Sequence, residues 1–393
     1  MPDDLVTWAE IDLDAIQSNL RAIRRHIGDG PEIIAVVKAN AYGHGAVPVG
    51  RAVLQAGAAR LAVHRAVEGI ELRQAGLDAP ILVMGYTPPA AAGRLVDHRL
   101  TPSLTTAEFA RALSERSLAA GRTTPVHLKV DTGMSRYGLM PEEVLAIARL
   151  VKDLPGLELE GLFTHFATSD WADQTFVRQQ LKTFEDVLAA LGQAGISVPV
   201  IHASNSGAIQ MFPESHLTAV RPGIILYGLK ASDQWQPAFP LQPALSLKSR
   251  LSRVREVPAG AGISYGRTVV TSRPTRVGLV PVGYGDGYHR ALSNKGIVLV
   301  RGQRAPILGR VCMDQFVIDV SAVPGAQQDD EVVLVGAQGE DAITADEIAR
   351  LLGTINYEVT TSLLPRVTRV YRQGGEWVGR SGLGEEDRPA GPG

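Results

Sequence analysis

The chain has 393 residues, 45% of them hydrophobic and 20% charged, a composition typical of a globular protein with two domains or one large α/β barrel plus an addition. Lys and Arg number 39 against 41 Asp and Glu, so the formal charge is −2, which argues against a nucleic-acid partner. The single cysteine, Cys312, excludes an internal disulfide and a cysteine-based metal site, and it indicates a reducing compartment.

The first residues, MPDDLVTWAEIDLDAI, are acidic and have no hydrophobic core of a secretion signal. No apolar run along the chain approaches the length that spans a bilayer. We therefore expect a cytoplasmic protein with no membrane partner.

From residue 31 onward, short β-branched runs alternate with amphipathic stretches. The runs predict strands over 33–37, 61–63, 81–84, 99–103, 126–130, 157–164, 198–203 and 218–221. The stretches between them predict helices over 46–56, 66–74, 107–119, 142–152 and 174–191. About eight strand–helix units favour a (β/α)8 TIM-type barrel. A doubly wound sheet is the alternative, but no G-x-G-x-x-G follows the first strand.

The pattern changes after Lys230, where ASDQWQPAFPLQP is rich in proline and has the composition of a linker. Strand-like runs follow at 245–257, 277–282, 297–300, 317–320, 331–335 and 366–371, with one helix predicted over 345–352. We predict a barrel over 1–237, a mostly β domain over 238–380 and a disordered tail over 381–393. The strand-like segment 6–11 precedes the first barrel helix and is a candidate to pair with the C-terminal domain.

Polar residues follow the predicted barrel strands, at the end where barrels of this kind carry their active sites. They are Lys38, Lys129, Asp131, Arg136, His165, Ser204 to Gly207, Arg221 and Gly223. A lysine that ends a buried strand suits imine formation, because desolvation lowers its pKa. Hydroxyls and small residues after the last two strands suit a phosphate. A Schiff-base lysine with a phosphate site indicates pyridoxal phosphate, or a sugar-phosphate aldol or isomerase reaction, and spacing does not separate them.

The chain resembles the alanine racemase family over roughly residues 5 to 372. The motifs that carry the resemblance occur in the family's order across both domains: AVVKANAYGHG, HLKVDTGMSRYG, THFATSD, HASNSGA, AVRPGIILYG, ISYGRTVV, VPVGYGDGYHR, GRVCMDQF and INYEVTT. The resemblance implies a (β/α)8 barrel followed by a mostly β domain, a pyridoxal phosphate cofactor, and production of D-alanine for the bacterial cell wall.

The resemblance also assigns the catalytic groups. It implies that Lys38 binds the cofactor as an imine and acts as the base on one face of the substrate. It implies that Tyr265 is the base on the other face and comes from the partner subunit of a homodimer. Racemisation needs a group on each face, because the proton leaves one side of a planar carbon and returns to the other. His165 and Arg221 are implied to lower the pKa of the phenol through a hydrogen-bonded network.

By the same resemblance, Arg221 faces the pyridine nitrogen of the cofactor. A guanidinium donates a hydrogen bond but does not protonate the ring. The electron sink is then weakened, so we expect fast reprotonation of the carbanion and little transamination.

The resemblance extends to binding residues. Those implied for the phosphate are Tyr42, Ser204, Gly223, Ile224 and Tyr357. Arg136 is implied to contact the cofactor's phenolic oxygen and the substrate carboxylate, and the backbone N–H of Met313 the carboxylate as well. Lys129 resembles a lysine that many members carry as a carbamate able to pair with Arg136. The substrate corridor is implied to include Asp170, Tyr284, Arg290 and Arg310. No metal ion is expected.

Two segments depart from the family's usual pattern, with His289 in the corridor segment and His64 and Arg65 after the second strand. These differences concern the entrance of the substrate corridor and the rigidity of the loops. None of these residues is among those assigned to catalysis. Two other functions remain possible interpretations of the sequence. One is a racemase of the same fold for serine or basic amino acids, and the other is a barrel protein that binds pyridoxal phosphate without catalysis.

Overall fold

The computed structural model describes residues 4–383 and 385–389, and its chain divides into two compact units. One unit contains residues 16–41 and 46–242, and the other contains residues 1–15, 42–45 and 243–393. Among the described residues, no helix combines the length and apolarity needed to cross a membrane.

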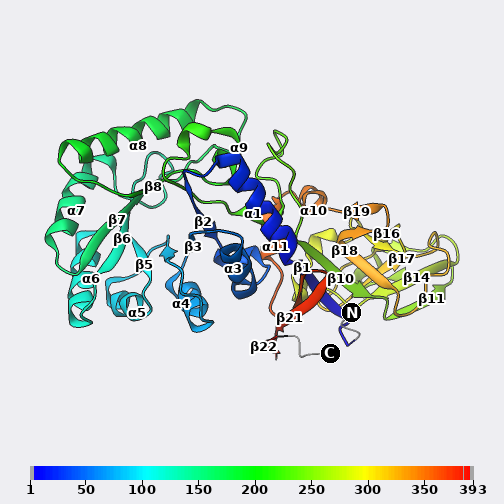
Figure 1. Ribbon diagram of the computed structural model, residues 1–393. Coiled ribbons are helices and arrows are strands. Elements are labelled where there is room, and N and C mark those ends of the chain that lie inside the picture. The colour runs from blue at the N-terminus through cyan, green and yellow to red at the C-terminus, as the bar shows by residue number, and fades with distance from the viewer. Residues whose placement is uncertain (1–3, 384, 390–393) are drawn as a thin grey trace. The chain divides into compact units, whose positions relative to one another are not determined.

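The first unit contains a closed barrel of parallel strands, drawn from blue to green in Figure 1. In order around the barrel the strands are β2 (Glu32–Val36), β3 (Arg60–Val63), β4 (Ile81–Val83), β5 (Thr101–Leu104), β6 (Thr124–Lys129), β7 (Leu157–Phe163), β8 (Val200–His202) and β9 (Ala219–Val220). Pairing of β9 with β2 closes the ring through Glu32 with Ala219 and Ile33 with Val220. The prediction of an eight-stranded TIM-type barrel is confirmed, with strand bounds close to those expected.

Helices precede the first barrel strand and connect the successive strands, and a short turn follows the last one. They are α1 (Leu13–Ile27), α2 (Lys38–Tyr42), α3 (Ala46–Gln55), α4 (Ala66–Gln74), α5 (Ala92–Asp97), α6 (Ala107–Ala119), α7 (Pro141–Asp153), α8 (Thr175–Gln193) and α9 (Ser206–Met211), with short turns η1 (Pro89–Ala91), η2 (Pro213–Ser215) and η3 (Ile224–Tyr227). The long helix α8 buries one face, including Val177, Leu181 and Phe184, at the three- and four-residue spacing that predicted it.

The second unit is built on a mixed sheet, and the mostly β domain predicted there is confirmed. The strand order is β11 (Arg253–Val257), β14 (Thr275–Val280), β17 (Phe316–Asp319), β16 (Gln303–Leu308), β15 (Ile297–Val300), β18 (Glu331–Gln338), β10 (Leu245–Arg250), β1 (Thr7–Asp12), β20 (Thr368–Gln373), β21 (Glu376–Gly382) and β22 (Glu385–Pro389), and β19 (Asp341–Ile343) pairs with β18. A separate ribbon joins β12 (Gly262–Ile263) to β13 (Val269–Val270). The helices are α10 (Ala345–Leu352) and α11 (Asn356–Thr361), with turns η4 (Tyr265–Arg267), η5 (Tyr284–Asp286) and η6 (Arg290–Leu292).

The N-terminal strand β1 lies inside this sheet. It pairs antiparallel with β10 and parallel with β20, and Trp8, Ala9 and Ile11 are fully buried. Strand β1 therefore packs in the C-terminal unit, the partner suggested for segment 6–11 by its sequence.

Two expectations differ from the structure. The run 245–257 forms two strands, β10 and β11, because the chain turns at Leu251 and Ser252. The tail expected to be disordered instead extends the sheet through Gly382 in β21 and through β22, which pairs with β21. Position 384 and residues 390–393 of that tail lie outside the described residues.

Candidate active site

Lys38 follows the first barrel strand and begins a turn of unusual backbone. Residues Ala39, Asn40, Ala41 and Tyr42 have φ between 52° and 54°, the left-handed region that costs a non-glycine residue about 1–2 kcal/mol. The Asn40 side chain accepts a hydrogen bond from the Ala46 backbone at 2.7 Å. Strain of this kind persists where surrounding contacts hold it, often at functional sites. The turn fixes the backbone from which Lys38 extends.

Glu68 supports the same turn from helix α4. One carboxylate oxygen accepts from the backbone N–H of Ala39 at 2.6 Å, and the other accepts from those of His64 and Arg65 at 2.8 and 2.7 Å. His64 and Arg65, the departures noted in the sequence, therefore give their backbone amides to the carboxylate that holds the Lys38 turn.

Four cations lie near one another at the carboxyl ends of the barrel strands, namely Lys38, Lys129, Arg136 and Arg221. Burial lowers the pKa of Lys38, and the charge of Arg136 lowers it further. Burial and Arg136 also lower the pKa of Lys129 to about 8. Mutual repulsion of this kind is relieved by an anionic ligand, so the group fits a phosphate or a carboxylate.

His165 lies beside these cations and is neutral. Burial, and then the charges of Arg221 and Arg136, hold the pKa of its imidazole well below the ordinary value. It is therefore available to donate through one ring nitrogen and to accept through the other.

Asp131 shapes the loop that presents Arg136. Its carboxylate accepts hydrogen bonds from the backbone N–H groups of Gly133, Ser135 and Arg136 at 2.9 to 3.0 Å. Burial opposes the charge of Asp131, but these backbone donors outweigh it and lower its pKa. The loop leaves the Arg136 side chain exposed, as a residue that meets a ligand must be.

Arg221 follows β9 and is held by an almost complete set of acceptors. Its NH1 donates to His202 Nδ1 and to the His202 carbonyl, both at 2.8 Å, and its NH2 donates to the carbonyls of Thr164 and Ala203 at 2.6 and 3.0 Å. Burial lowers the pKa of Arg221 to about 9, so the guanidinium stays charged at neutral pH. Among the described residues no hydrogen bond involves its Nε–H, which leaves that donor for a ligand.

The predicted phosphate residues of the barrel unit occupy two environments. The Ser204 hydroxyl is fully buried and bonds to the Ser215 carbonyl and hydroxyl at 2.8 and 2.6 Å. The hydroxyl of Ser206, two residues later, instead accepts from the backbone N–H of Gly223 at 2.8 Å, next to Ile224. The hydroxyl that lies beside the predicted phosphate residues Gly223 and Ile224 is therefore that of Ser206, and not that of Ser204. The motif H-A-S-N-S-G offers both hydroxyls, and only their neighbours separate them.

The other predicted phosphate residues, Tyr42 and Tyr357, belong to the second unit and lie together there. Their ring centroids are 6.0 Å apart. Gly43 follows Tyr42 with φ +88°, and a Cβ at that position would lie 2.1 Å from the Thr360 carbonyl oxygen. The close approach of this backbone to helix α11 is what pairs the two tyrosines.

Tyr265 lies on a strained turn of the second unit and is 74% exposed. Ser264 and Arg267, on either side, have φ of 59° and 47°, and the Ser264 hydroxyl donates to the Arg310 carbonyl at 2.7 Å. The Arg310 guanidinium lies beside the same turn, since a Cβ on Gly266 would be 3.5 Å from its Nε. This fixed backbone holds the Tyr265 phenol in solvent.

Met313 and Tyr284 lie on two loops that pack together in this unit. The Gly285 N–H donates to the Met313 carbonyl at 2.8 Å, and a Cβ at Gly283 would lie 2.2 Å from that oxygen. The side chains of Met313 and Tyr284 are 53% and 40% exposed. Both side chains therefore reach the surface of the second unit.

The remaining corridor residues are placed in both units. Asp170 lies in the barrel unit, where its carbonyl accepts from Trp235 Nε1 at 3.1 Å. Arg290 begins turn η6 of the second unit, directly after His289. The structure places Lys38, Lys129, Arg136, His165 and Arg221 at one end of the barrel, and Tyr265, Tyr284, Arg310 and Met313 on loops of the second unit.

Comparisons with known proteins cover almost the whole chain. A model of the alanine racemase N-terminal domain matches residues 11–231, and a model of the alanine racemase C-terminal domain matches residues 244–371. An alanine racemase of Carboxydothermus hydrogenoformans is 48% identical over 365 residues, which are 93% of this chain and 99% of the relative.

Solved structures give the same result. An alanine racemase of Clostridium difficile 630 superposes with a TM-score of 0.93 at 39% identity and covers 96% of this chain and 98% of its own. One from Bacillus anthracis with bound L-Ala-P has a TM-score of 0.91 at 38% identity, with 96% and 98% covered. A histidine racemase of Leuconostoc mesenteroides is more distant, at 29% identity and a TM-score of 0.86, with 94% and 98% covered.

Proposed function

The chain belongs to the alanine racemase family, the resemblance predicted from its motifs, and we propose that it interconverts L- and D-alanine with two bases, Lys38 and Tyr265. Alanine racemases are isomerases that depend on pyridoxal phosphate and supply D-alanine for peptidoglycan, and the same activity applies to this chain. The observation that carries the proposal is the group of four cations at the end of the barrel, formed by Lys38 at the end of a strand and three other cations near it.

The residues of the barrel unit fit pyridoxal phosphate. When bound, the cofactor supplies an electron-withdrawing ring that stabilises the charge left on the substrate carbon as its proton departs. Lys38 has the lowered pKa that an amine needs to bind a carbonyl group. The Ser206 hydroxyl, which accepts from the Gly223 amide, and the adjacent amide of Ile224 suit the phosphate. Tyr42 and Tyr357, which belong to the second unit, stay predictions for that group. The free Nε–H of Arg221 suits the ring nitrogen.

Arg221 would determine how strongly the ring of a bound cofactor draws charge. Because a guanidinium donates a hydrogen bond without giving up its proton, Arg221 would hold the ring nitrogen without protonating it. A ring held in this way would draw less charge from the substrate carbon, which would favour return of a proton to that carbon. This is the property that a racemase needs and a transaminase does not.

Tyr265 acts on the second face of the substrate, and we assign it to a site on another copy of the chain. In a single chain the phenol is 74% exposed, and a proton acceptor in open solvent has no advantage over water. The exposed Met313 and Tyr284 give the same surface an apolar character. A homodimer in which each chain brings Tyr265 and the Met313 backbone N–H to its partner's site accounts for both features. Arg136 would hold the substrate carboxylate there.

Lys129 provides a prediction of its own. With its pKa lowered to about 8, an appreciable fraction is neutral amine near pH 7.5, and a neutral amine forms a carbamate with carbon dioxide. The carbamate would turn one of four clustered cations into an anion that pairs with Arg136. Protein in ¹³C-bicarbonate is expected to show a protein-bound carbamate signal by NMR that Lys129→Ala abolishes. Lys182→Ala, which changes an exposed lysine paired with Asp186, serves as the control and is expected to keep it. A carbamate signal that survives in Lys129→Ala contradicts the assignment.

Substrate choice tests the function as a whole. Purified protein with pyridoxal phosphate is expected to racemise alanine with a kcat/KM at least about tenfold above serine, lysine and histidine, since the site of an alanine racemase would have to accommodate a side chain larger than one methyl group. Chiral chromatography of each product measures this. Equal rates on alanine and histidine would assign the chain a broader racemase activity, and absence of turnover would reject catalysis. Location in the cytoplasm stays a prediction from the sequence.

A further inference from the structure

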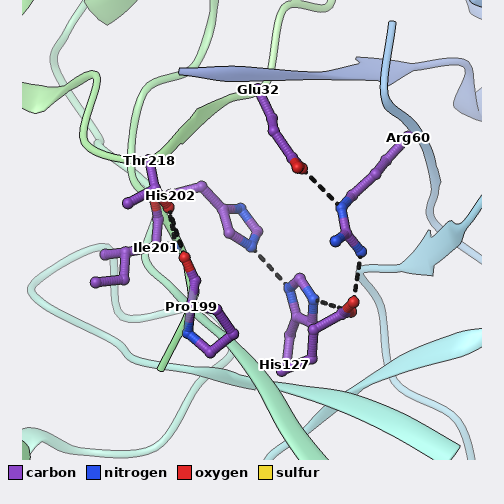
Figure 2. A network of polar contacts seen from close by, with 8 residues as sticks. Glu32, Arg60, His127, Pro199, Ile201, His202 and Thr218 are labelled. Atoms are coloured by element: carbon purple, nitrogen blue, oxygen red, sulfur yellow. Dashed lines mark hydrogen bonds and ion pairs between the residues drawn. The ribbon is translucent and has the colours of Figure 1, made fainter. Parts of the chain in front are cut away.

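A line of hydrogen-bonded polar side chains lies inside the barrel, where such barrels usually hold branched apolar residues. It starts at Arg221, whose NH1 is 2.8 Å from His202 Nδ1. His202 Nε2 is 2.8 Å from His127 Nδ1, and His127 Nε2 is 2.9 Å from a Glu160 carboxylate oxygen. Both imidazoles are fully buried, and Figure 2 shows them in line, with one ring nitrogen of each directed toward the other.

The line continues to the opposite end of the barrel. The second Glu160 oxygen accepts from Arg60 NH1 at 2.8 Å, and Arg60 Nε donates to Glu32 at 2.9 Å, as Figure 2 also shows for the last pair. Glu32 and Arg60 are the first residues of β2 and β3, and the Glu32 side chain is 44% exposed. Arg221 follows the end of β9. The line therefore runs from the amino end of the barrel to the end that carries the site.

The sequence makes room for this line at one place. Val126 pairs with Leu159 and His127 pairs with Gly161, so Glu160 is an extra residue in β7, a β-bulge of the kind that redirects a side chain. A Cβ on Gly161 would lie 2.3 Å from His127 Nδ1. Glycine at 161 and the bulge at 160 together let the imidazole and the carboxylate meet.

The two ends of the line determine where its protons lie. Arg221 can only donate, so His202 Nδ1 accepts and its proton lies on Nε2. His202 Nε2–H then donates to His127 Nδ1, which places the His127 proton on Nε2, where the Glu160 carboxylate accepts it. Each imidazole is thereby neutral, with a single tautomer.

The charged groups that face this line also favour neutral imidazoles at His127 and His202 and a charged carboxylate at Glu160. Burial lowers the pKa of both imidazoles, and the charges of Arg221 and Arg60 lower it further, against Glu160, which raises that of His127. Burial opposes the charge of Glu160, but hydrogen bonds from His127 and Arg60 lower its pKa to about 2. Phe163 is a further close neighbour, and its uncharged ring stacks on His202 with the ring centroids 4.8 Å apart.

We propose that His127 and Glu160 are positioning residues for Arg221, because the Glu160 carboxylate fixes the protons of both imidazoles and so makes His202 an acceptor for the guanidinium. If His202 carried its proton on Nδ1, two donors would face each other and the guanidinium would lose one of its four hydrogen bonds. The free Nε–H of Arg221 would then be directed less precisely. Only the effect on the cofactor's ring nitrogen rests on the function proposed above; the placement of the protons does not.

The wild-type protein tests the placement of protons directly. In ¹⁵N NMR of the histidine side chains, both His127 and His202 are expected to be neutral with the proton on Nε2 between pH 6 and 9, in cofactor-free and in loaded protein. A charged imidazole, or an Nδ1 proton on either residue, overturns the proposal. This result does not depend on alanine turnover, so a failure of the proposed function would leave it standing.

Glu160→Gln tests the consequence for Arg221. The amide keeps the shape, but it lacks the charge and can donate as well as accept, so it no longer dictates a tautomer. We expect a changed His127 tautomer, a shifted visible absorbance of bound pyridoxal phosphate, and a kcat for alanine about ten- to a hundredfold lower with KM within about twofold.

Glu32→Gln is the matched control, because Glu32 also pairs with Arg60 but touches neither imidazole. It is expected to keep the wild-type tautomers, absorbance and kcat. Wild-type behaviour of folded Glu160→Gln in all three measurements overturns the positioning role, as does an equal change in Glu32→Gln. Should Glu160→Gln fail to fold, the wild-type tautomers still decide the proposal.

Discussion

Tyr265→Phe is expected to keep bound pyridoxal phosphate and to lose racemisation by about 10²- to 10⁴-fold, the usual contribution of a positioned acid or base. The ring of phenylalanine fills the same space, so only the proton-transferring oxygen is removed. Lys38 remains, and it can still exchange the α-proton of the enantiomer whose proton it faces. In D₂O we expect one enantiomer of alanine to exchange its α-proton without inversion, and the other to stay unlabelled.

This asymmetry separates a two-base mechanism from a one-base mechanism. Mass spectrometry of L- and D-alanine incubated separately measures it. Tyr86→Phe is the control, since Tyr86 is also an exposed tyrosine, 64% accessible, but belongs to the barrel unit and not to the turn that carries Tyr265. Equal loss of exchange from both enantiomers in Tyr265→Phe, with cofactor still bound, would contradict the assignment.

Lys38→Ala is expected to have the second large effect, because it removes both the covalent attachment of the cofactor and one base. We expect activity to fall by at least about 10³-fold. The visible absorbance of the bound cofactor should disappear on gel filtration. Borohydride should fix pyridoxal phosphate on the Lys38 peptide of the wild type and on no peptide of the variant.

Lys182→Ala serves again as a matched control, since Lys182 is an exposed lysine on helix α8 with an ion pair to Asp186. It is expected to retain both cofactor and activity. Borohydride labelling at Lys129 in place of Lys38 would reverse the roles given to the two lysines of the barrel mouth.

Much of the fold could be predicted from the sequence, because local pattern and tertiary environment agree there. Buried parallel strands are short and rich in β-branched residues, so the runs at 33–37 and 61–63 lie within a residue of β2 and β3. The helix predicted over 345–352 has the bounds of α10, where Thr344 caps the first turn and Gly353 ends the last.

The features that were missed depend on contacts between distant residues. Nothing in K-A-N-A-Y predicts four left-handed residues, since the conformation is held by Glu68 and the Ala46 amide. The tail sequence has little apolar surface to bury, yet its backbone pairs with β21, and backbone pairing is open to almost any residue. Sequence could not choose between Ser204 and Ser206 for the same reason: the choice is made by Ser215 and Gly223.

The line of polar side chains inside the barrel shows most clearly that contacts between distant residues cannot be predicted from local sequence. The run 126–130 was predicted as an ordinary strand, and its period of two indicates only that alternate residues face inward. That His127 meets His202 and Glu160 depends on a bulge in β7 and on Gly161. Neither is a local property of the strand that carries the histidine.

Mixing the two inactive variants tests most directly whether one site is built by two chains. If Lys38 of one chain works with Tyr265 of the other, a hybrid of Lys38→Ala and Tyr265→Phe chains contains one intact site and one doubly altered site. Subunit exchange at equal concentrations should then restore about a quarter of the wild-type activity, because half the dimers are hybrids with one working site in two. If both groups act within one chain, no hybrid has an intact site, and a mixture as inactive as its components would contradict the account.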